Sequence, residues 1–115
     1  MTRQQDIGRK AEARAEDMLQ REGLHPVARN YRCRGGEIDL VMRDGECMVF
    51  IEVRYRHHSA WGGAAASVDR GKQRRLILAA RHFLQSNHWS GPCRFDVVAF
   101  EQGSTETWIR NAFDS

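Results

Sequence analysis

The stretch that decides the fold is GEIDLVMRDGECMVFIEVR, residues 36–54. Residues Glu37–Arg43 and Cys47–Arg54 alternate in the way that predicts β-strands, because successive side chains of a strand point to opposite faces. Asp44-Gly45 between them is a strong signal for a tight turn, so an antiparallel hairpin is predicted. One face of the first strand is expected to hold Ile38, Leu40 and Met42, and the other Glu37, Asp39 and Val41. In the second strand we expect Val49, Ile51 and Val53 on one face and Phe50, Glu52 and Arg54 on the other.

Further elements extend outward from this hairpin. Apolar residues at helical spacing predict helices over residues 6–22 and 68–87. Extended segments are predicted over residues 25–32 and 95–100, with a last short strand over residues 107–113. The order is therefore helix, three strands, helix, and one or two strands. At 115 residues the length predicts a single domain, residues 1–115.

Composition excludes several protein classes. No apolar run is long enough to span a bilayer, and the polar N-terminus lacks the apolar core of a signal peptide, so we expect a cytoplasmic protein without membrane contact. Three separated cysteines and no CxxC pair argue against a disulfide framework or a cysteine zinc site. The formal charge is +3, and the basic residues concentrate between Arg54 and Arg81. This distribution suits a phosphate backbone as partner, although it also fits a solvated helix face.

Two carboxylates stand out because each lies in a strand that otherwise looks buried. Asp39 follows Ile38, and Glu52 lies within the apolar stretch VFIEV. Burying two acids side by side is costly unless a cation neutralises them. Because the hairpin places their strands next to each other, Asp39 and Glu52 can converge on one ion, and hard oxygen ligands suit Mg²⁺ or Mn²⁺.

Arg54 completes this constellation, because it lies two residues after Glu52 and projects on the same face of the strand. A metal lowers the pKa of a bound water, and a neighbouring cation stabilises charge that develops on a phosphate. The pattern therefore indicates phosphodiester hydrolysis. The alternative is a surface hairpin that carries an ordinary acid–arginine pair.

At this point the sequence resembles a known family. The segments Gly36-Glu-Ile-Asp-Leu-Val41, Phe50-Ile-Glu-Val-Arg-Tyr-Arg56, Lys72-Gln-Arg-Arg-Leu76 and Arg94-Phe-Asp-Val-Val98, with Gly8-x-x-Ala-Glu12 before them, are similar to the YraN family. That bacterial family resembles archaeal Holliday-junction resolvases and the PD-(D/E)xK nuclease superfamily. The resemblance implies an α/β, restriction-endonuclease-like fold: a mixed central sheet of four to five strands flanked by helices.

The resemblance also implies roles for single residues. Asp39 matches the metal-binding aspartate, Glu52 the second acid, and Arg54 the position of the superfamily's lysine. Glu12 matches an additional glutamate from the first helix, and Gln73 a glutamine beside some of these sites. We therefore predict Asp39, Glu52 and Val53 as metal ligands, and Asp39, Glu52, Arg54, Glu12 and Gln73 as catalytic residues.

The departure at Arg54 has a chemical consequence. Lysine can release a proton, whereas arginine effectively cannot. Arg54 can clamp a phosphate or hold a water, but it cannot act as a general base, and Lys72 is a candidate to replace the lysine.

Several basic residues are predicted to contact nucleic acid: Arg56, His57, Lys72, Arg74 and Arg75. Trp61 could stack on a base or anchor its loop.

Three hypotheses remain open from the sequence. The first is a Mg²⁺- or Mn²⁺-dependent endonuclease acting on DNA, in particular branched DNA, for which a homodimer is expected by analogy because two-fold junctions need two active sites. The second is a catalytically inactive nucleic-acid-binding module of the same fold, and the third a protein-interaction domain.

Overall fold

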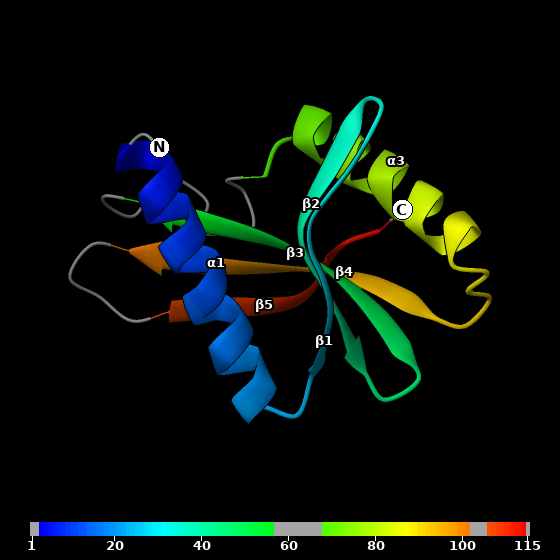
Figure 1. Ribbon diagram of the computed structural model, residues 1–115, viewed down its shortest axis with the longest axis horizontal. Coiled ribbons are helices and arrows are strands. Elements are labelled where there is room, and N and C mark those ends of the chain that lie inside the picture. The colour runs from blue at the N-terminus through cyan, green and yellow to red at the C-terminus, as the bar shows by residue number, and fades with distance from the viewer. Residues whose placement is uncertain (1–2, 57–67, 102–105, 115) are drawn as a thin grey trace.

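The computed structural model describes residues 3–56, 68–101 and 106–114. In this part of the chain a five-stranded sheet carries a helix on either side (Figure 1). In chain order the elements are α1 (Arg3–Arg21), β1 (His25–Cys33), β2 (Gly36–Asp44), β3 (Cys47–Arg56), α3 (Arg70–Ser86), β4 (Cys93–Glu101) and β5 (Glu106–Phe113). The predicted elements are confirmed with small changes at their ends.

The sheet is mixed, with the strands in the order β1-β2-β3-β4-β5. Strands β3 and β4 run parallel, and every other neighbouring pair is antiparallel. A parallel pair needs a crossover connection, and α3 lies between these two strands in the chain. The predicted α/β class with a mixed sheet flanked by helices is confirmed, and it is consistent with a restriction-endonuclease-like fold.

The central hairpin forms as predicted. Strand β2 pairs with β3 from Asp44 opposite Cys47 to Leu40 opposite Ile51. Gly45, in the turn, has a φ of 59°, a conformation that glycine adopts without steric cost. Asp-Gly at this position therefore determines the register that brings Asp39 toward Glu52.

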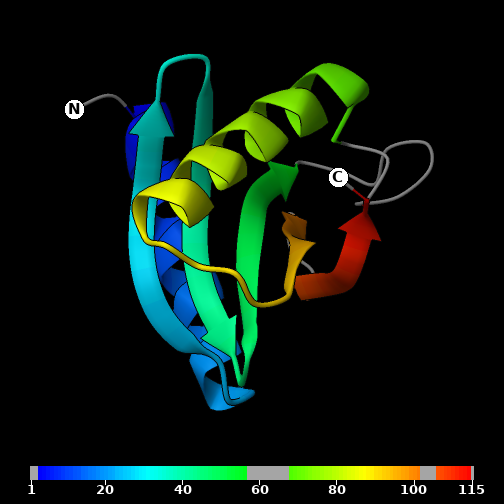
Figure 2. The same ribbon diagram turned by 90° about the vertical axis from the view of Figure 1, so that its right-hand side faces the viewer.

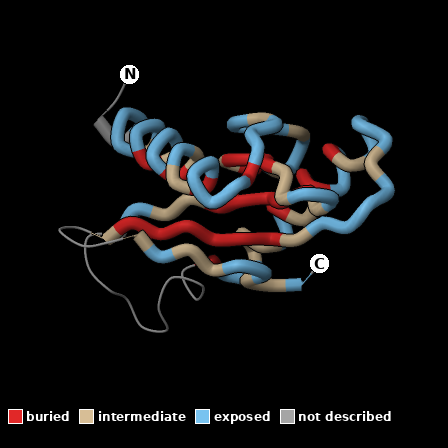
Figure 3. Tube along the Cα trace, turned by 90° about the horizontal axis from the view of Figure 1, so that it is seen from below, coloured by how far each residue is buried: buried red, intermediate tan, exposed pale blue. Residues whose placement is uncertain are grey.

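Helices α1 and α3 cover opposite faces of the sheet, as Figure 2 shows. One buried cluster joins α1 to one face, and it includes Leu19, Leu40, Val49 and Ile51. The other joins α3 to the opposite face, and it includes Val41, Phe50, Leu76 and Phe83. The buried trace follows the central strands between the helices (Figure 3).

The predicted alternation along β2 is wrong at one residue. Ile38 packs in the cluster with α3, whereas Leu40 and Met42 pack in the cluster with α1. Strict alternation would have placed all three on one face. The side chains change face between Ile38 and Leu40. The pairing of β2 with β3 also ends at this point, because Leu40 is the last residue of β2 that pairs with β3.

A glycine allows α3 to approach the start of β2 closely. A Cβ atom on Gly36 would lie 2.4 Å from the carbonyl oxygen of Arg75 and 3.1 Å from the Cβ of Ala79. Real side chains do not tolerate the shorter distance, so glycine is required if α3 is to keep its position. This contact fixes the distance between α3, at Arg75 and Ala79, and the start of β2.

Neither helix in the part of the chain that the structure describes is both long and apolar enough to cross a bilayer.

Candidate metal site

The candidate site lies where β2 and β3 separate. The two strands are joined by their hairpin at one end and diverge at the other, where α3 passes over them (Figure 2). In the register that pairs Leu40 with Ile51, the next residues are Asp39 and Glu52, one step beyond the last paired positions. The Val53 amide donates a 2.9 Å hydrogen bond to Oδ2 of Asp39. The Asp39 carboxylate is therefore held at the point of divergence by the backbone of the neighbouring strand.

Glu52 is buried in a way that carboxylates seldom are. Its exposed fraction is 3%, and its buried Oε2 has no hydrogen-bond partner in the described structure. Burial, followed by the charge of the adjacent Asp39, raises the pKa of Glu52 from its ordinary 4.5 to about 8. An orphaned carboxylate oxygen beside a second acid is a costly arrangement without a cation.

Lys72 on α3 brings a positive charge to Glu52 and to the nearby Glu37. Its Nζ lies 3.6 Å from Oε1 of Glu52 and 3.8 Å from Oε1 of Glu37. Asp69 caps the helix and accepts a 2.8 Å hydrogen bond from the Lys72 amide, which fixes where the lysine side chain begins. The sequence predicts that Lys72 contacts nucleic acid and is a candidate replacement for the missing lysine, and the structure places it beside Glu52 and Glu37.

Arg54 lies on the same strand as Glu52, and its positive charge lowers the pKa of Glu52 in opposition to the larger effect of burial. Arg54 is half-buried. Two cations therefore flank the buried acid, Arg54 from the strand and Lys72 from the helix.

Glu12 approaches the site from α1. Burial and then the charge of Asp39 raise the pKa of the half-buried Glu12, although a hydrogen bond with Asn30 and nearby arginines oppose this shift. Glu12 also lines a polar pocket of about 430 Å³ together with Gln5, Gly8, Arg9, Asn30 and Arg32. The structure thus brings Glu12 within electrostatic reach of Asp39, as the predicted role requires.

Gln73 has a structural contact of its own. Its side-chain amide donates a 3.0 Å hydrogen bond to the carbonyl oxygen of Val68. Its backbone amide donates a hydrogen bond to the carbonyl oxygen of Asp69. These bonds stabilise the chain where it enters α3. The predicted catalytic role of Gln73 stays a prediction.

The other predicted nucleic-acid contacts divide into two groups. Arg74 and Arg75 are exposed on α3, and their guanidinium groups reach back toward its first turn. A Cβ on Gly71 would lie 3.7 Å from Nη1 of Arg75 and 3.9 Å from Nη2 of Arg74. His57 and Trp61 lie outside the described residues, as does the side chain of Arg56.

The donor set fits a divalent cation of the Mg²⁺ type. Such an ion binds through one or two carboxylates and keeps several water ligands, and Asp39 and Glu52 are the carboxylates here that could hold it. Within residues 3–56, 68–101 and 106–114, no group of three or more His, Cys, Asp or Glu residues could hold a metal. Val53 uses its amide to hold Asp39, and its predicted role as a ligand stays a prediction.

Asp96, the other buried acid, has a purely structural set of partners. It accepts hydrogen bonds from the Arg94 guanidinium, from the indole of Trp108 and from the Asn111 amide. Arg94 also bonds Asp44. This network spans the irregular β4–β5 pairing, where the register shifts between Phe95 and Val97. Asp96 is therefore fully satisfied, in contrast to Glu52.

Sequence reasoning did not predict that Lys72 would form ion pairs with Glu52 and Glu37. The signal available was the N-cap pattern Asp69-x-x-Lys72, which places a lysine in the first turn of a helix that follows the acidic strand. Its distance from Glu52 depends on how α3 packs, and sequence periodicity does not determine this.

Comparisons with known proteins establish the family. Residues 11–100 match the uncharacterised protein family UPF0102, so the chain belongs to it, in agreement with the YraN resemblance. A UPF0102 protein of Cupriavidus pinatubonensis is 62% identical over 109 residues, covering 93% of this chain and 84% of its own length. One from Aeromonas hydrophila is 59% identical over 109 residues, covering 92% and 83%. One from Ectopseudomonas mendocina is 52% identical over the full length of both chains.

Proposed function

We propose that this UPF0102 protein is a divalent-metal-dependent endonuclease that hydrolyses DNA phosphodiesters, with Mg²⁺ or Mn²⁺ held by Asp39 and Glu52. The observation that carries the proposal is the orphaned, buried Oε2 of Glu52 beside a second carboxylate. A cation between the two acids removes the cost of burying them.

The surrounding residues suit phosphodiester chemistry. A bound divalent ion would supply a water of lowered pKa and stabilise charge on the phosphate. Arg54 stays protonated and can hold a phosphate oxygen, since its guanidinium matches that geometry. Lys72 lies at the same acid and can both donate and accept a proton. The exposed Arg74 and Arg75 extend the positive surface along α3 toward a nucleic-acid backbone.

The direct test is cleavage of duplex, single-stranded and branched DNA in Mg²⁺, in Mn²⁺ and in EDTA. We expect metal-dependent products from the wild type and none from Asp39→Ala. Asp17→Ala is the matched control, because Asp17 is an exposed acid on α1 whose side chain is 61% accessible. Calorimetric titration with Mn²⁺ should show binding by the wild type and by the control, and its loss in Asp39→Ala. No product from the wild type in either metal, or equal cleavage by Asp39→Ala, would contradict the proposal.

One observation favours a second function, a nucleic-acid-binding module without turnover. The Lys72–Glu52 contact places a positive charge beside the buried acid without any metal, and the usual lysine position holds Arg54. For this function we expect DNA binding that weakens with salt, together with the absence of product in every metal. Gain of cleavage by Arg54→Lys would identify a weakened active site rather than a binding module.

The branched-DNA preference and the homodimer remain proposals that follow from the resemblance. Comparing the cleavage of a four-way junction with that of a linear duplex of equal length tests the preference for branched DNA. Light scattering with and without the junction measures whether the protein is a dimer.

A further inference from the structure

The polar pocket that Glu12 lines is built by α1 and β1 together. Its volume is about 430 Å³, and its lining residues are Gln5, Gly8, Arg9 and Glu12 of α1 and Asn30 and Arg32 of β1. A Cβ on Gly8 would have nothing within 4 Å, so the helix leaves the pocket open at this position. Arg9 and Arg32 are exposed, and together they outnumber Glu12, the one acid among these lining residues. The pocket therefore favours an anion.

The strand register places this pocket next to Asp39. Strand β1 pairs with β2 so that the residues on either side of Asn30 lie opposite Leu40 and Ile38, and Asn30 therefore lies across from Asp39. Asn30 has a φ of 51°, in the left-handed region that asparagine adopts more readily than most residues. Its side chain forms a hydrogen bond with Glu12. An anion in the pocket would thus lie close to the proposed metal site.

A row of alternating charges leads from the pocket to the buried acid. Arg32 is paired with Glu37 in the sheet, and its Nε lies 3.5 Å from Oε2 of Glu37. The other oxygen of Glu37 lies 3.8 Å from Nζ of Lys72, which is 3.6 Å from Oε1 of Glu52. Arg32 also lines a smaller hollow of about 210 Å³ together with Arg75 of α3. Positive side chains therefore continue from the pocket toward the basic surface of α3.

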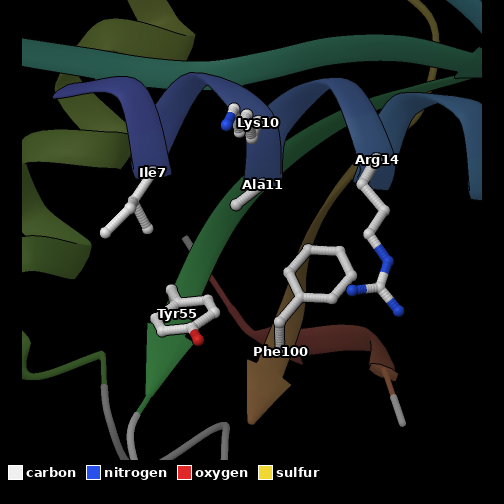
Figure 4. A pocket seen from close by; sticks show the side chains of 6 residues that line it. All are labelled: Ile7, Lys10, Ala11, Arg14, Tyr55 and Phe100. Atoms are coloured by element: carbon white, nitrogen blue, oxygen red, sulfur yellow. The ribbon is translucent and has the colours of Figure 1, made fainter. Parts of the chain in front are cut away.

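A neighbouring pocket on α1 has a different character. It is mainly apolar, and its lining residues are Ile7, Lys10, Ala11, Arg14, Tyr55 and Phe100 (Figure 4). Its arginine, Arg14, is held by an ion pair of 3.0 Å with Glu106. Arg9 and Lys10 are adjacent in the chain, yet Arg9 lines the polar pocket and Lys10 the apolar one. Lys10 therefore serves as a matched control for Arg9.

We infer that Arg9 and Arg32 together bind one backbone phosphate of the DNA, at a linkage that flanks the one hydrolysed at Asp39 and Glu52. The inference rests on the proposed function, because it takes DNA as the substrate. Guanidinium groups match the oxygens of a phosphate in geometry and stay protonated. Contacts to phosphates fix the register of a protein on DNA. The pocket therefore determines which linkage reaches the two acids.

The first test measures binding in EDTA, where no hydrolysis takes place. Fluorescence anisotropy follows a short labelled duplex between about 50 and 200 mM NaCl. We expect Arg9→Gln/Arg32→Gln to weaken binding by about tenfold or more. The slope of log affinity against log salt should fall by the equivalent of about one phosphate contact. Arg9→Lys/Arg32→Lys keeps both charges and should keep the slope.

The control removes the same charge elsewhere. Lys10→Gln/Arg110→Gln alters the apolar pocket and β5, which forms the opposite edge of the sheet from β1, and it should leave the affinity and the slope nearly unchanged. The single variants Arg9→Gln and Arg32→Gln complete a double-mutant cycle. If both arginines hold the same phosphate, the loss in the double variant should differ from the product of the single losses by about twofold or more. Thermal unfolding shows whether each variant is folded.

Three results would overturn the inference: unchanged binding by Arg9→Gln/Arg32→Gln, equal losses in the control variant, or single losses that multiply to give the loss in the double variant. Metal-dependent cleavage by the wild type together with any of these would overturn the inference and leave the proposed function standing. Coupled losses at Arg9 and Arg32 without cleavage in either metal would overturn the proposed function and leave the phosphate site standing.

Discussion

The substitution Glu52→Gln should remove a pH-dependent loss of stability from the metal-free protein. Glu52 has a folded-state pKa of about 8 against 4.5 when unfolded, so the folded state holds a proton that the unfolded state has released. Stability from this group is complete below pH 4.5 and is lost as the pH rises toward 8. Glutamine keeps the shape of the side chain and has no proton to lose.

The magnitude follows from these two pKa values. Between pH 6 and pH 8 the unfolded carboxyl is ionised throughout, while the folded one changes from almost fully protonated to half ionised. At 1.36 kcal/mol per pKa unit, the free energy of unfolding should fall by about 2 kcal/mol over this interval. For a domain of this length that corresponds to about 8 °C in Tm.

The assay is thermal unfolding in EDTA at pH 6 and pH 8. The wild type and Glu52→Gln share the same five histidines, so the difference between their pH dependences reports on the acid pair at Glu52 and not on the histidines. Adding Mn²⁺ at pH 8 should raise the Tm of the wild type by ligand linkage and leave that of Glu52→Gln nearly unchanged. Parallel pH curves for the two proteins would refute the reasoning, because Glu52 would then ionise in the folded state as it does in water.

Two further predictions concern packing and the second buried acid. Gly36→Ala should destabilise the protein by about 1–3 kcal/mol in urea unfolding, since the added Cβ meets a backbone carbonyl of α3. Gly8→Ala is its control, because nothing lies within 4 Å of that Cβ, and a stabilisation of up to about 1 kcal/mol is expected in the helix. Asp96→Asn should cost about 3 kcal/mol by breaking its buried network with arginine. The exposed Asp17→Asn should cost less than about 0.5 kcal/mol by the same measurement, and similar losses for the two would show that the Asp96 network adds no stability.

The hairpin and its two acids were predictable because the information is local. Alternation defines the strands, Asp44-Gly45 defines the turn, and the turn fixes the register from Asp44 and Cys47 to Leu40 and Ile51. Asp39 and Glu52 follow as the next positions along the same register.

Non-local features were not predictable in the same way. The parallel pairing of β3 with β4 depends on how α3 returns the chain, and periodicity within each segment says nothing about it. Ile38 lies on the other face from Leu40 because the β2–β3 pairing ends at Leu40. The contact between Lys72 and Glu52 depends on the close approach of α3 to Gly36. Helix α3 and Gly36 are far apart in the sequence, so local patterns do not reveal this approach.

Arg54 and Lys72, the two cations near Glu52, can have different roles in hydrolysis. Arg54 is permanently charged, whereas Lys72, whose Nζ lies 3.6 Å from Glu52, can exchange a proton. If hydrolysis needs proton transfer from this position, Lys72→Gln should lower the cleavage rate by about 10²–10⁴-fold, and metal affinity measured by calorimetry should change little. The double variant Lys72→Gln/Arg54→Lys then regains activity, since a lysine is restored on the neighbouring strand.

If the site needs only positive charge, the outcome differs. Arg54 already supplies that charge, so Lys72→Gln would keep most of the rate, and Arg54→Lys added to it would change little. Lys72→Arg distinguishes the two cases a second time. Arginine keeps the positive charge on α3 but cannot release a proton. Loss of cleavage in Lys72→Arg together with rescue by the double variant would assign proton transfer to the helix lysine. Retained cleavage in Lys72→Arg would assign Lys72 the same electrostatic role as Arg54.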